Sequence, residues 1–207
     1  MLSRRSSILV LALLILVLTG EALYYSWREQ QPRENEYDPI IARLSHDAGV
    51  DPFLIRALIW RESRFNPLTH GSADERGLMQ VTPEVGQLWA RINKVPNFKD
   101  DDLYQPETNI RVGIWYLNRS IHLWDQTDAP VTFALAEYNA GRSNAKRWVD
   151  PAAPHDPNAF LNRITFPTTR KYVEVILAKR DEYREKLADN RWYRAYAEAN
   201  PAMTLTP

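Results

Sequence analysis

Cysteine is absent from the 207 residues, and its absence excludes several kinds of site. Without a thiol the chain has no disulfide, no thiolate metal ligand, no lipid-modified cysteine and no cysteine nucleophile. The redox compartment of the protein does not follow from this absence. Net charge is missing as well, since 26 Lys and Arg balance 26 Asp and Glu. Because no basic stripe interleaves with aromatic residues, nucleic acid is not an expected partner.

Alternating strand patterns, internal repeats and paired metal-binding histidines are also missing. The four histidines have none of the spacings of a zinc-binding helix, so neither a metal ion nor another cofactor is expected. The composition is otherwise that of a globular protein, with 44% apolar and 25% charged residues, seven Trp and ten Tyr. We expect such a chain to fold, and its length suits one domain.

The longest apolar run, residues 8–18, is short for a membrane span. It holds eleven residues, whereas a helix that crosses a bilayer needs roughly 20. Two arginines precede it, which is typical of an export signal with its N-terminus inside. We expect residues 1–27 to be an uncleaved signal anchor, because Leu18 stands where cleavage after Gly20 requires a small residue; a cleaved signal peptide is the alternative. The remaining chain would then lie in the periplasm or on the outer face of the cytoplasmic membrane.

The chain after the anchor is predicted to be an all-α domain between a linker and a tail. Residues 28–37 are polar and lack periodicity, which indicates a linker; the domain is expected over 38–190 and a tail over 191–207. Polar residues that precede prolines indicate helix starts, because they cap the first turn and proline fits its first position. These pairs are Asp38-Pro39, Asp51-Pro52, Thr82-Pro83, Gln105-Pro106 and Asp156-Pro157. Apolar residues at helical spacing after Pro106 and Pro167 agree with this fold class.

One carboxylate lies on the apolar side of a predicted helix. Four apolar residues span roughly 140° of the helical wheel, and Glu62 falls between their limits. They are Leu54, Ile55, Leu58 and Ile59. Burial there would raise the pKa of the Glu62 carboxyl, as general-acid catalysis near neutral pH requires. From position alone, an ion pair at a frayed helix end is the preferred interpretation, with Arg56, Arg61 or Arg64 as the partner.

Three sequence blocks change that interpretation. They are Glu62-Ser63-Arg64-Phe65-Asn66-Pro67, Gly77-Leu78-Met79-Gln80 and Tyr138-Asn139-Ala140-Gly141. In order and spacing they resemble the soluble-lytic-transglycosylase family of the lysozyme-like superfamily. The similarity runs from about residue 39 to about 180, and it includes Asp102–Ile110 and Thr169–Val173. The resemblance implies a single lysozyme-like helical domain.

The resemblance also implies a reaction. In that family the glutamate protonates the glycosidic oxygen between N-acetylmuramic acid and N-acetylglucosamine, and then deprotonates the muramic C6 hydroxyl to give a 1,6-anhydro sugar. Glu62 is thereby expected to be the catalytic acid and base of a peptidoglycan lytic transglycosylase that needs no cofactor. The internal hydroxyl replaces the second carboxylate of other glycosidases. Asp74, Glu75 and Glu137, the nearest candidates for a second acid, are interpreted as solvated or structural.

Six residues are expected to bind or support the glycan: Ser63, Met79, Gln80, Tyr138, Asn139 and Tyr172. By resemblance, Met79 and Gln80 line the cleft and Tyr138 reaches toward the catalytic carboxyl. Asn139 is expected to hold the N-acetyl group or the loop. Tyr172 is the aromatic residue that we expect to stack on a sugar face.

Two positions depart from the family pattern. Gly71 stands nine residues after the glutamate, where many relatives have serine, and Thr168 stands where they have glutamate. Ser72 could replace the missing serine, and we expect activity with altered subsites. Two alternative functions are a muramidase in which water attacks and a catalytically idle peptidoglycan-binding module. Loss of Glu62 would be the sequence sign of such a module, and Glu62 is present. The sequence does not specify protein partners in an envelope complex.

Overall fold

The computed structural model describes residues 15–21 and 34–187 of the chain. The chain divides into two units, residues 1–33 and 34–207. In the first unit, residues 15–21 are helical and their apolar side chains are exposed. Within the described part of the chain, no helix is both long enough and apolar enough to cross a bilayer.

The predicted anchor, linker and tail fall largely on residues that the structure does not describe. Of the anchor over residues 1–27, only residues 15–21 are described, and of the linker over 28–37 only the last four residues. The tail predicted over 191–207 lies outside the described residues entirely. These assignments therefore stay predictions.

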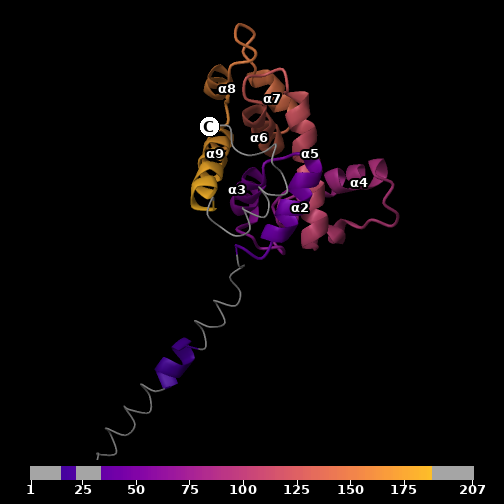
Figure 1. The fold of residues 1–207 in the computed structure, drawn as a ribbon, viewed down its shortest axis with the longest axis vertical. Coiled ribbons are helices and arrows are strands. Elements are labelled where there is room, and N and C mark those ends of the chain that lie inside the picture. Colours follow the sequence, from indigo (N-terminus) through magenta and orange to yellow (C-terminus); the bar gives the residue numbers. More distant parts are fainter. Residues whose placement is uncertain (1–14, 22–33, 188–207) are drawn as a thin grey trace, which may run out of the picture. The chain divides into compact units, whose positions relative to one another are not determined.

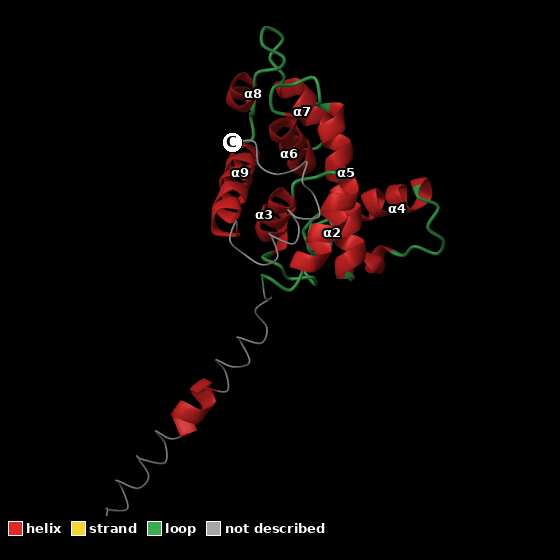
Figure 2. Ribbon diagram, in the orientation of Figure 1, coloured by secondary structure: helices red, strands yellow, loops and turns green. Residues whose placement is uncertain are grey.

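The second unit is built from helices, and no strand occurs within residues 34–187 (Figures 1 and 2). In chain order its elements are α2 (Asp38–Ala48), α3 (Pro52–Ser63), α4 (Pro83–Ile92), the 3₁₀ helix η1 (Asp100–Tyr104), α5 (Pro106–Leu123), α6 (Pro130–Ala140), α7 (Arg142–Trp148), α8 (Pro157–Arg163) and α9 (Pro167–Leu187). Two isolated bridges, from His70 to Arg76 and from Arg76 to Val81, fasten the loop between α3 and α4. The all-α prediction is confirmed for this part of the chain.

Most helix starts follow the proline signal. Helices α3, α4, α5 and α8 begin at the predicted prolines, and the side chains of Asp51, Thr82 and Asp156 accept hydrogen bonds from the first turns of α3, α4 and α8. Helix α2 instead begins at Asp38, one residue before the predicted proline. The signal missed α6, because Ala129 before its first proline has no side-chain oxygen to act as a cap.

Helices α3 and α6 form the centre of the second unit. Helix α3 packs against α2 and α9, and α6 packs against α5, α7 and α9 (Figure 1). Residues 52–59 are all buried, so α3 is enclosed more completely than the one-sided stripe that the sequence predicted. Only its last turn approaches solvent, and this brings Glu62 to the boundary between core and surface.

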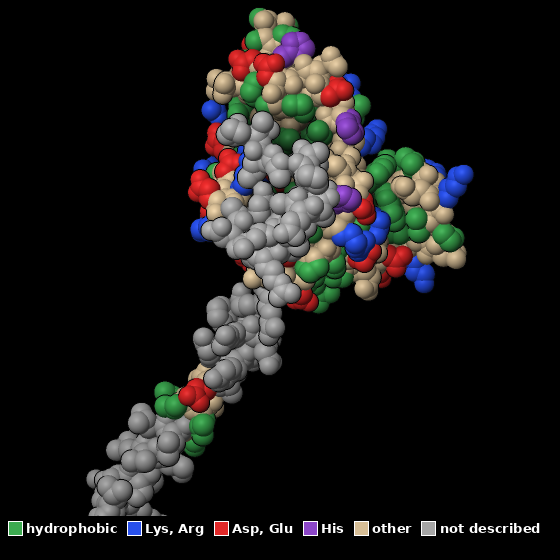
Figure 3. Space-filling view, viewed as in Figure 1, with side chains coloured by type: hydrophobic (Ala, Val, Ile, Leu, Met, Phe, Trp, Pro, Cys, Tyr) green, Lys and Arg blue, Asp and Glu red, His purple; other side chains and the backbone are tan. Residues whose placement is uncertain are grey.

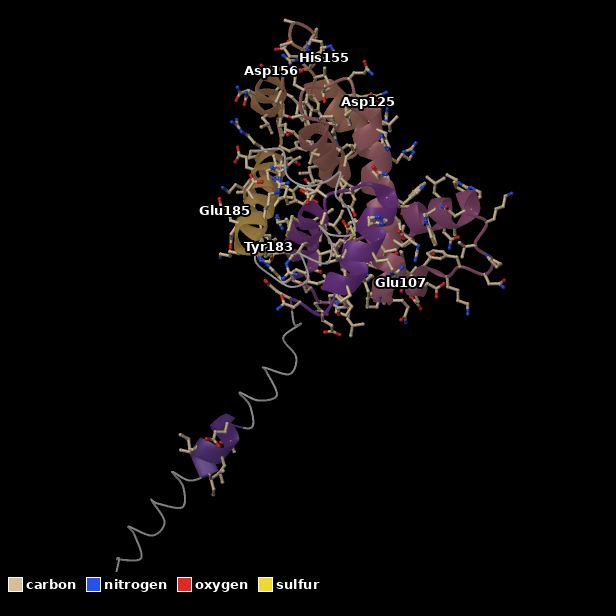
Figure 4. The ribbon with its side chains drawn as sticks, viewed as in Figure 1. Glu107, Asp125, His155, Asp156, Tyr183 and Glu185 are labelled. Atoms are coloured by element: carbon tan, nitrogen blue, oxygen red, sulfur yellow. The ribbon has the colours of Figure 1, made fainter. Side chains whose placement is uncertain are left out.

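A buried arginine ties α3 to its neighbours. Arg56 is 2% exposed and forms ion pairs with Asp38 of α2 and with Glu34. Its guanidinium carbon lies 4.8 Å from the ring centroid of Tyr183, which lies on the side of α9 that faces α3 (Figure 4). A buried charge is tolerated only where such partners compensate for lost hydration. Arg56 is therefore occupied by these contacts and does not pair with Glu62.

Asn109 of α5 holds the backbone of the Gly77-Leu78-Met79-Gln80 block. Its buried side chain accepts from the Met79 N–H at 2.7 Å and donates to the carbonyl oxygens of Arg76 and Leu103, each at 2.7 Å. Gly77 has φ 75°, and a Cβ there would lie 2.4 Å from the Asn109 amide nitrogen. The position thus requires glycine both for its backbone and for space.

We expect Asn109→Ala to lower the free energy of unfolding by roughly 3–5 kcal/mol, because three buried backbone groups would lose their partners at about 1–3 kcal/mol each. Urea denaturation followed by circular dichroism measures this loss. The matched control is Asn118→Ala on the same helix, where a partly exposed side chain makes one hydrogen bond, to the Ala48 carbonyl at 3.0 Å. Its cost should be about 1 kcal/mol. Equal losses in the two variants would contradict the bracing role of Asn109.

Candidate active site

Glu62 lies in the last turn of α3, which two residues with left-handed backbone terminate. Arg64 and Phe65 have φ 54° and 63°, a conformation that costs residues other than glycine about 1–3 kcal/mol each. Phe65 is fully buried, so core packing supports the strained turn. The helix thereby ends at Ser63, one residue after Glu62, with the carboxyl at the edge of a cleft.

Burial raises the pKa of Glu62 to about 7. Loss of hydration is the largest cause of the rise. The Tyr172 hydrogen bond and the charge of Arg61 act against it, and the negative charge of Glu75 adds to it. With a pKa near ambient pH, the group can release a proton and take one back.

The ion pair considered for Glu62 is not formed among the described residues. Arg56 pairs with Asp38, and the guanidinium of Arg64 lies 3.7 Å from the ring centroid of Trp60. Arg61 lies 5.4 Å from the ring centroid of Tyr172 and acts on Glu62 through its charge alone. The preferred interpretation from wheel position is therefore wrong.

Tyr172 of α9 provides the hydrogen bond to Glu62. Its hydroxyl donates to Oε1 of the carboxyl over a short contact, across the interface between α3 and α9. The tyrosine is 1% exposed, and burial raises the pKa of its hydroxyl well above the usual value, which keeps the proton on the donor. A ring buried to this degree cannot stack on a sugar. The expectation that Tyr172 stacks on a sugar is therefore wrong. Its position instead suits a residue that orients the Glu62 carboxyl.

Tyr138 of α6 lines the cleft but does not donate to the carboxyl. Its hydroxyl donates to the Met79 carbonyl oxygen at 2.8 Å, and its ring lies 5.5 Å from that of Tyr116. The charge of Glu62 nevertheless raises the pKa of the Tyr138 hydroxyl, after burial as the larger cause, so the two groups are close. The predicted contact with Glu62 is therefore made by Tyr172 instead.

Ser63 and Met79 support the cleft from behind. The Ser63 hydroxyl contacts the Leu78 carbonyl oxygen at 2.7 Å and so connects the end of α3 to the Gly77–Gln80 block. The Met79 side chain is fully buried, and its sulfur would lie 2.5 Å from a Cβ at Gly113. The expectation that Met79 lines the cleft is wrong. Its backbone contributes instead, as the acceptor for Tyr138.

Glu62 opens into a cleft of about 620 Å³ between α3, α6 and the loop before α4. Gln80, Tyr138 and Asn139, three of the six expected binding residues, line it together with Arg61. The remaining lining residues are Gly71, Ser72, Glu75, Val81, Thr82, Val85 and Tyr116. The lining carries both charges and several amides and hydroxyls, which suits a polar ligand such as a glycan.

Gln80 and Asn139, which both line this cleft, are each held in place by hydrogen bonds. Gln80 has φ 48°, and its amide nitrogen donates to the carbonyl oxygens of Thr69 at 3.1 Å and Gly77 at 2.9 Å. Asn139 is exposed, and its side-chain oxygen accepts from the Thr169 hydroxyl at 2.7 Å. Each amide thus keeps free donor or acceptor capacity toward the cleft.

Glu137 and Asp74, two of the possible second acids, have structural partners. Glu137 is 1% exposed and accepts from the side chains of Ser120 and Trp124. Asp74 forms an ion pair with Arg76 at 2.9 Å and does not line the cleft. Glu75 differs, because it lines the cleft with Glu62.

A larger hollow of about 690 Å³ lies elsewhere, between α2, α4 and α5. It is mainly apolar and contains none of the residues of the three sequence blocks. Hydrophobic side chains also gather over α4 in Figure 3, where Ile92 and Val95 are exposed. The smaller cleft is the candidate active site, because Glu62, the carboxyl with the raised pKa, lines it.

Sequence reasoning missed two supporting residues, Asn109 and Thr169. Asn109 is a polar residue inside the apolar pattern of α5, and such a position could have indicated a buried hydrogen-bonding role. Thr169 lies in the segment Thr169–Val173, which resembles the family, but the sequence indicated no role for its side chain. Among the described residues, no group of three or more His, Cys, Asp or Glu side chains has an arrangement that could hold a metal ion.

Comparisons with known proteins point to one family. The family model described as transglycosylase SLT domain matches residues 39–160. The soluble lytic murein transglycosylase of Salmonella typhimurium is 29% identical over 169 residues, which cover 77% of this chain and 26% of that protein. A membrane-bound lytic murein transglycosylase C of Photorhabdus laumondii is 31% identical over 121 residues, or 56% of this chain and 34% of the relative.

Solved structures show the same fold. An inactive mutant of the lytic transglycosylase Slt from Pseudomonas aeruginosa has a TM-score of 0.68 at 25% identity, over 74% of this chain and 25% of the other. The 70 kDa soluble lytic transglycosylase of Escherichia coli gives 0.67 at 28% identity, over 75% and 25%. The chain thus spans about a quarter of the length of these soluble relatives. By the family model and the shared lysozyme-like fold, the chain belongs to the transglycosylase SLT domain family.

Proposed function

We propose that this protein is a peptidoglycan lytic transglycosylase. It would cleave the β-1,4 bond between N-acetylmuramic acid and N-acetylglucosamine and leave a 1,6-anhydro-muramic acid end. The observation that carries the proposal is the Glu62 carboxyl, with a pKa of about 7, held by Tyr172 at the edge of an open polar cleft. The names of the relatives, which are lytic murein transglycosylases, support the choice of substrate.

Glu62 would act twice in one cycle. Its proton passes to the glycosidic oxygen as the bond from that oxygen to the muramic C1 breaks, and positive charge develops on the sugar ring. The resulting carboxylate then takes the proton of the C6 hydroxyl while the C6 oxygen bonds to C1. Glu62 ends protonated and no water is consumed. The Tyr172 hydroxyl stabilises the carboxylate between the two steps, because a hydrogen bond to the charged form favours it.

The cleft residues suggest how the glycan is held. Gln80 and Asn139 would hydrogen-bond the N-acetyl groups through their amides, and Tyr138 would bound the sugar on the α6 side. Ser63, Met79 and Tyr172 would act without touching the substrate, since each is buried behind the lining.

We also propose that the N-terminal segment holds the protein in the cell envelope. The arginines at its start and the apolar run over residues 8–18 support an anchor with the domain on the periplasmic side. Some relatives are named membrane-bound lytic murein transglycosylases, which agrees with this proposal.

Glu62→Gln should abolish cleavage while keeping the fold, because an amide matches the shape of the carboxyl and has no acidic proton. We expect glycan release from purified peptidoglycan sacculi to fall by roughly three orders of magnitude or more. Circular dichroism verifies the fold, and mass spectrometry of the wild-type products identifies their ends. Anhydro ends weigh one water less than reducing ends.

Other outcomes of this experiment would replace the proposal. Reducing ends in the wild-type digest would indicate a hydrolytic muramidase. Tight binding to sacculi without any cleavage would indicate a peptidoglycan-binding module. Near-normal turnover by folded Glu62→Gln would remove Glu62 from the mechanism.

Tyr172→Phe should move the alkaline limb of the activity profile to higher pH. Glu62 must be protonated to act as the acid, so activity falls as pH rises through its pKa of about 7. Removing a donor that stabilises the carboxylate raises that pKa, and the limb follows it. Tyr138→Phe is the control, because its hydroxyl donates to Met79 and its limb should stay in place. If the alkaline limb moves in Tyr138→Phe and stays in place in Tyr172→Phe, then Tyr138 and not Tyr172 donates the hydrogen bond to Glu62.

Removing residues 1–27 should release the domain from membranes, because the longest apolar run lies within them. Fractionation by ultracentrifugation measures the change, and the released domain should keep its activity on sacculi. A full-length chain that is recovered in the soluble fraction, with a mature N-terminus near Glu21, would instead show a cleaved signal peptide.

A further inference from the structure

The cleft contains a second carboxylate, Glu75, that the mechanism described above does not use. It lies in the loop between α3 and α4 and lines the same 620 Å³ cleft as Glu62. Its Oε2 accepts from the Ala73 N–H at 2.9 Å, which fixes the side chain over the loop. Glu75 is thus held by the loop backbone while it lines the cleft.

Gly71 provides the space for this carboxylate. A Cβ at Gly71 would lie 2.2 Å from Oε2 of Glu75 and 2.9 Å from Oε1 of Gln80. Real Cβ atoms essentially never come as close as 2.2 Å, so a side chain at position 71 and the Glu75 carboxylate in its present place exclude one another. The departure at Gly71 is therefore linked to the presence of the second carboxylate.

The charges around Glu62 give Glu75 a defined electrostatic effect. Tyr172 of α9 and Arg61 of α3 both favour the ionised form of Glu62, whereas the charge of Glu75 opposes it. The hydroxyl of Tyr138, from α6, donates to Met79 and gives no hydrogen bond to the carboxyl. Burial is the largest cause that keeps the proton on Glu62, and the charge of Glu75, the smallest of the four effects, acts in the same direction against Tyr172 and Arg61.

We propose that Glu75 is a second functional carboxylate of the cleft, whose negative charge retains the proton on Glu62 and stabilises the positive charge that develops on the cleaved sugar. This role rests on the proposed function, because it needs a glycosidic bond that breaks with charge at C1. A fixed charge in a partly enclosed site is already oriented when charge appears on the substrate. Glu75 would act through its charge, both on Glu62 and on the developing charge of the sugar, and needs no covalent bond to the sugar.

The first test compares Glu75→Gln with Asp74→Asn, which removes the same charge from the same loop outside the cleft. Asp74 has φ 63°, a conformation that asparagine tolerates. Glu75→Gln should lower turnover on sacculi at neutral pH by roughly tenfold and shift the alkaline limb to lower pH, because a like charge is lost. Asp74→Asn should keep the wild-type limb. An unchanged limb and turnover in Glu75→Gln would overturn the proposal.

The second test uses Gly71→Ala, which should displace the carboxylate without changing its charge. The backbone of Gly71 is outside the left-handed region, and the atoms nearest to the new Cβ are the ends of the flexible Glu75 and Gln80 side chains, so the variant should fold. The alkaline limb of the Gly71→Ala activity profile should shift to lower pH, as in Glu75→Gln. The double variant should be no slower than Glu75→Gln alone, because both changes remove one interaction. Fully additive losses would contradict the linkage between positions 71 and 75.

Titration of the Glu62 carboxyl by ¹³C NMR separates this proposal from the proposed function, since it requires no turnover. A lower Glu62 pKa in Glu75→Gln than in wild type supports the electrostatic role even if no sacculus is cleaved. If wild type cleaves sacculi and the Glu62 titration is the same in both proteins, the role of Glu75 fails while the proposed function stands.

Discussion

A titratable carboxyl at the end of a buried helix is the constraint around which this site is arranged. Ionised Glu62 loses hydration that the few groups around it restore only in part, and its pKa therefore rises to about 7. The opposing contact from Tyr172 reaches Glu62 only because α9 packs along α3. The balance between these effects sets the proton affinity of the group. Moving α9 away from α3 would change the chemistry of the site as well as the core.

The Gly77–Gln80 segment beside the cleft depends on one buried side chain, that of Asn109. Asn109 satisfies three backbone groups around Gly77, and the segment it fixes presents Gln80 to the cleft and the Met79 carbonyl oxygen to Tyr138. Ser63 joins this segment to the turn after Glu62. Stability and function thus share the same hydrogen bonds, as expected where a strained backbone surrounds a site.

The sequence predicted the helical class and placed Glu62 among apolar residues, and it failed where tertiary packing decides. Proline and its capping residue are local signals, so the starts of α3, α4, α5 and α8 followed from them. The position of Glu62 on the helical wheel placed it among apolar residues. The same position favoured an ion pair between Glu62 and a neighbouring arginine, which the fold does not form. Tyr138 and Tyr172 could not be told apart, because which hydroxyl reaches Glu62 depends on how α6 and α9 pack. The place of Glu75 in the cleft follows from the missing side chain at Gly71, a contact that spacing alone does not show.

The chemistry proposed for the cleft requires that the fold hold a proton on Glu62 near neutral pH. A ¹³C NMR titration of the wild-type protein, labelled at glutamate side-chain carboxyls, measures this proton affinity, with Glu62→Gln used to identify the resonance. The expected midpoint for Glu62 is about 7. A midpoint near the ordinary glutamate value of roughly 4.3 would contradict it, because the carboxyl would then have no proton to donate at neutral pH.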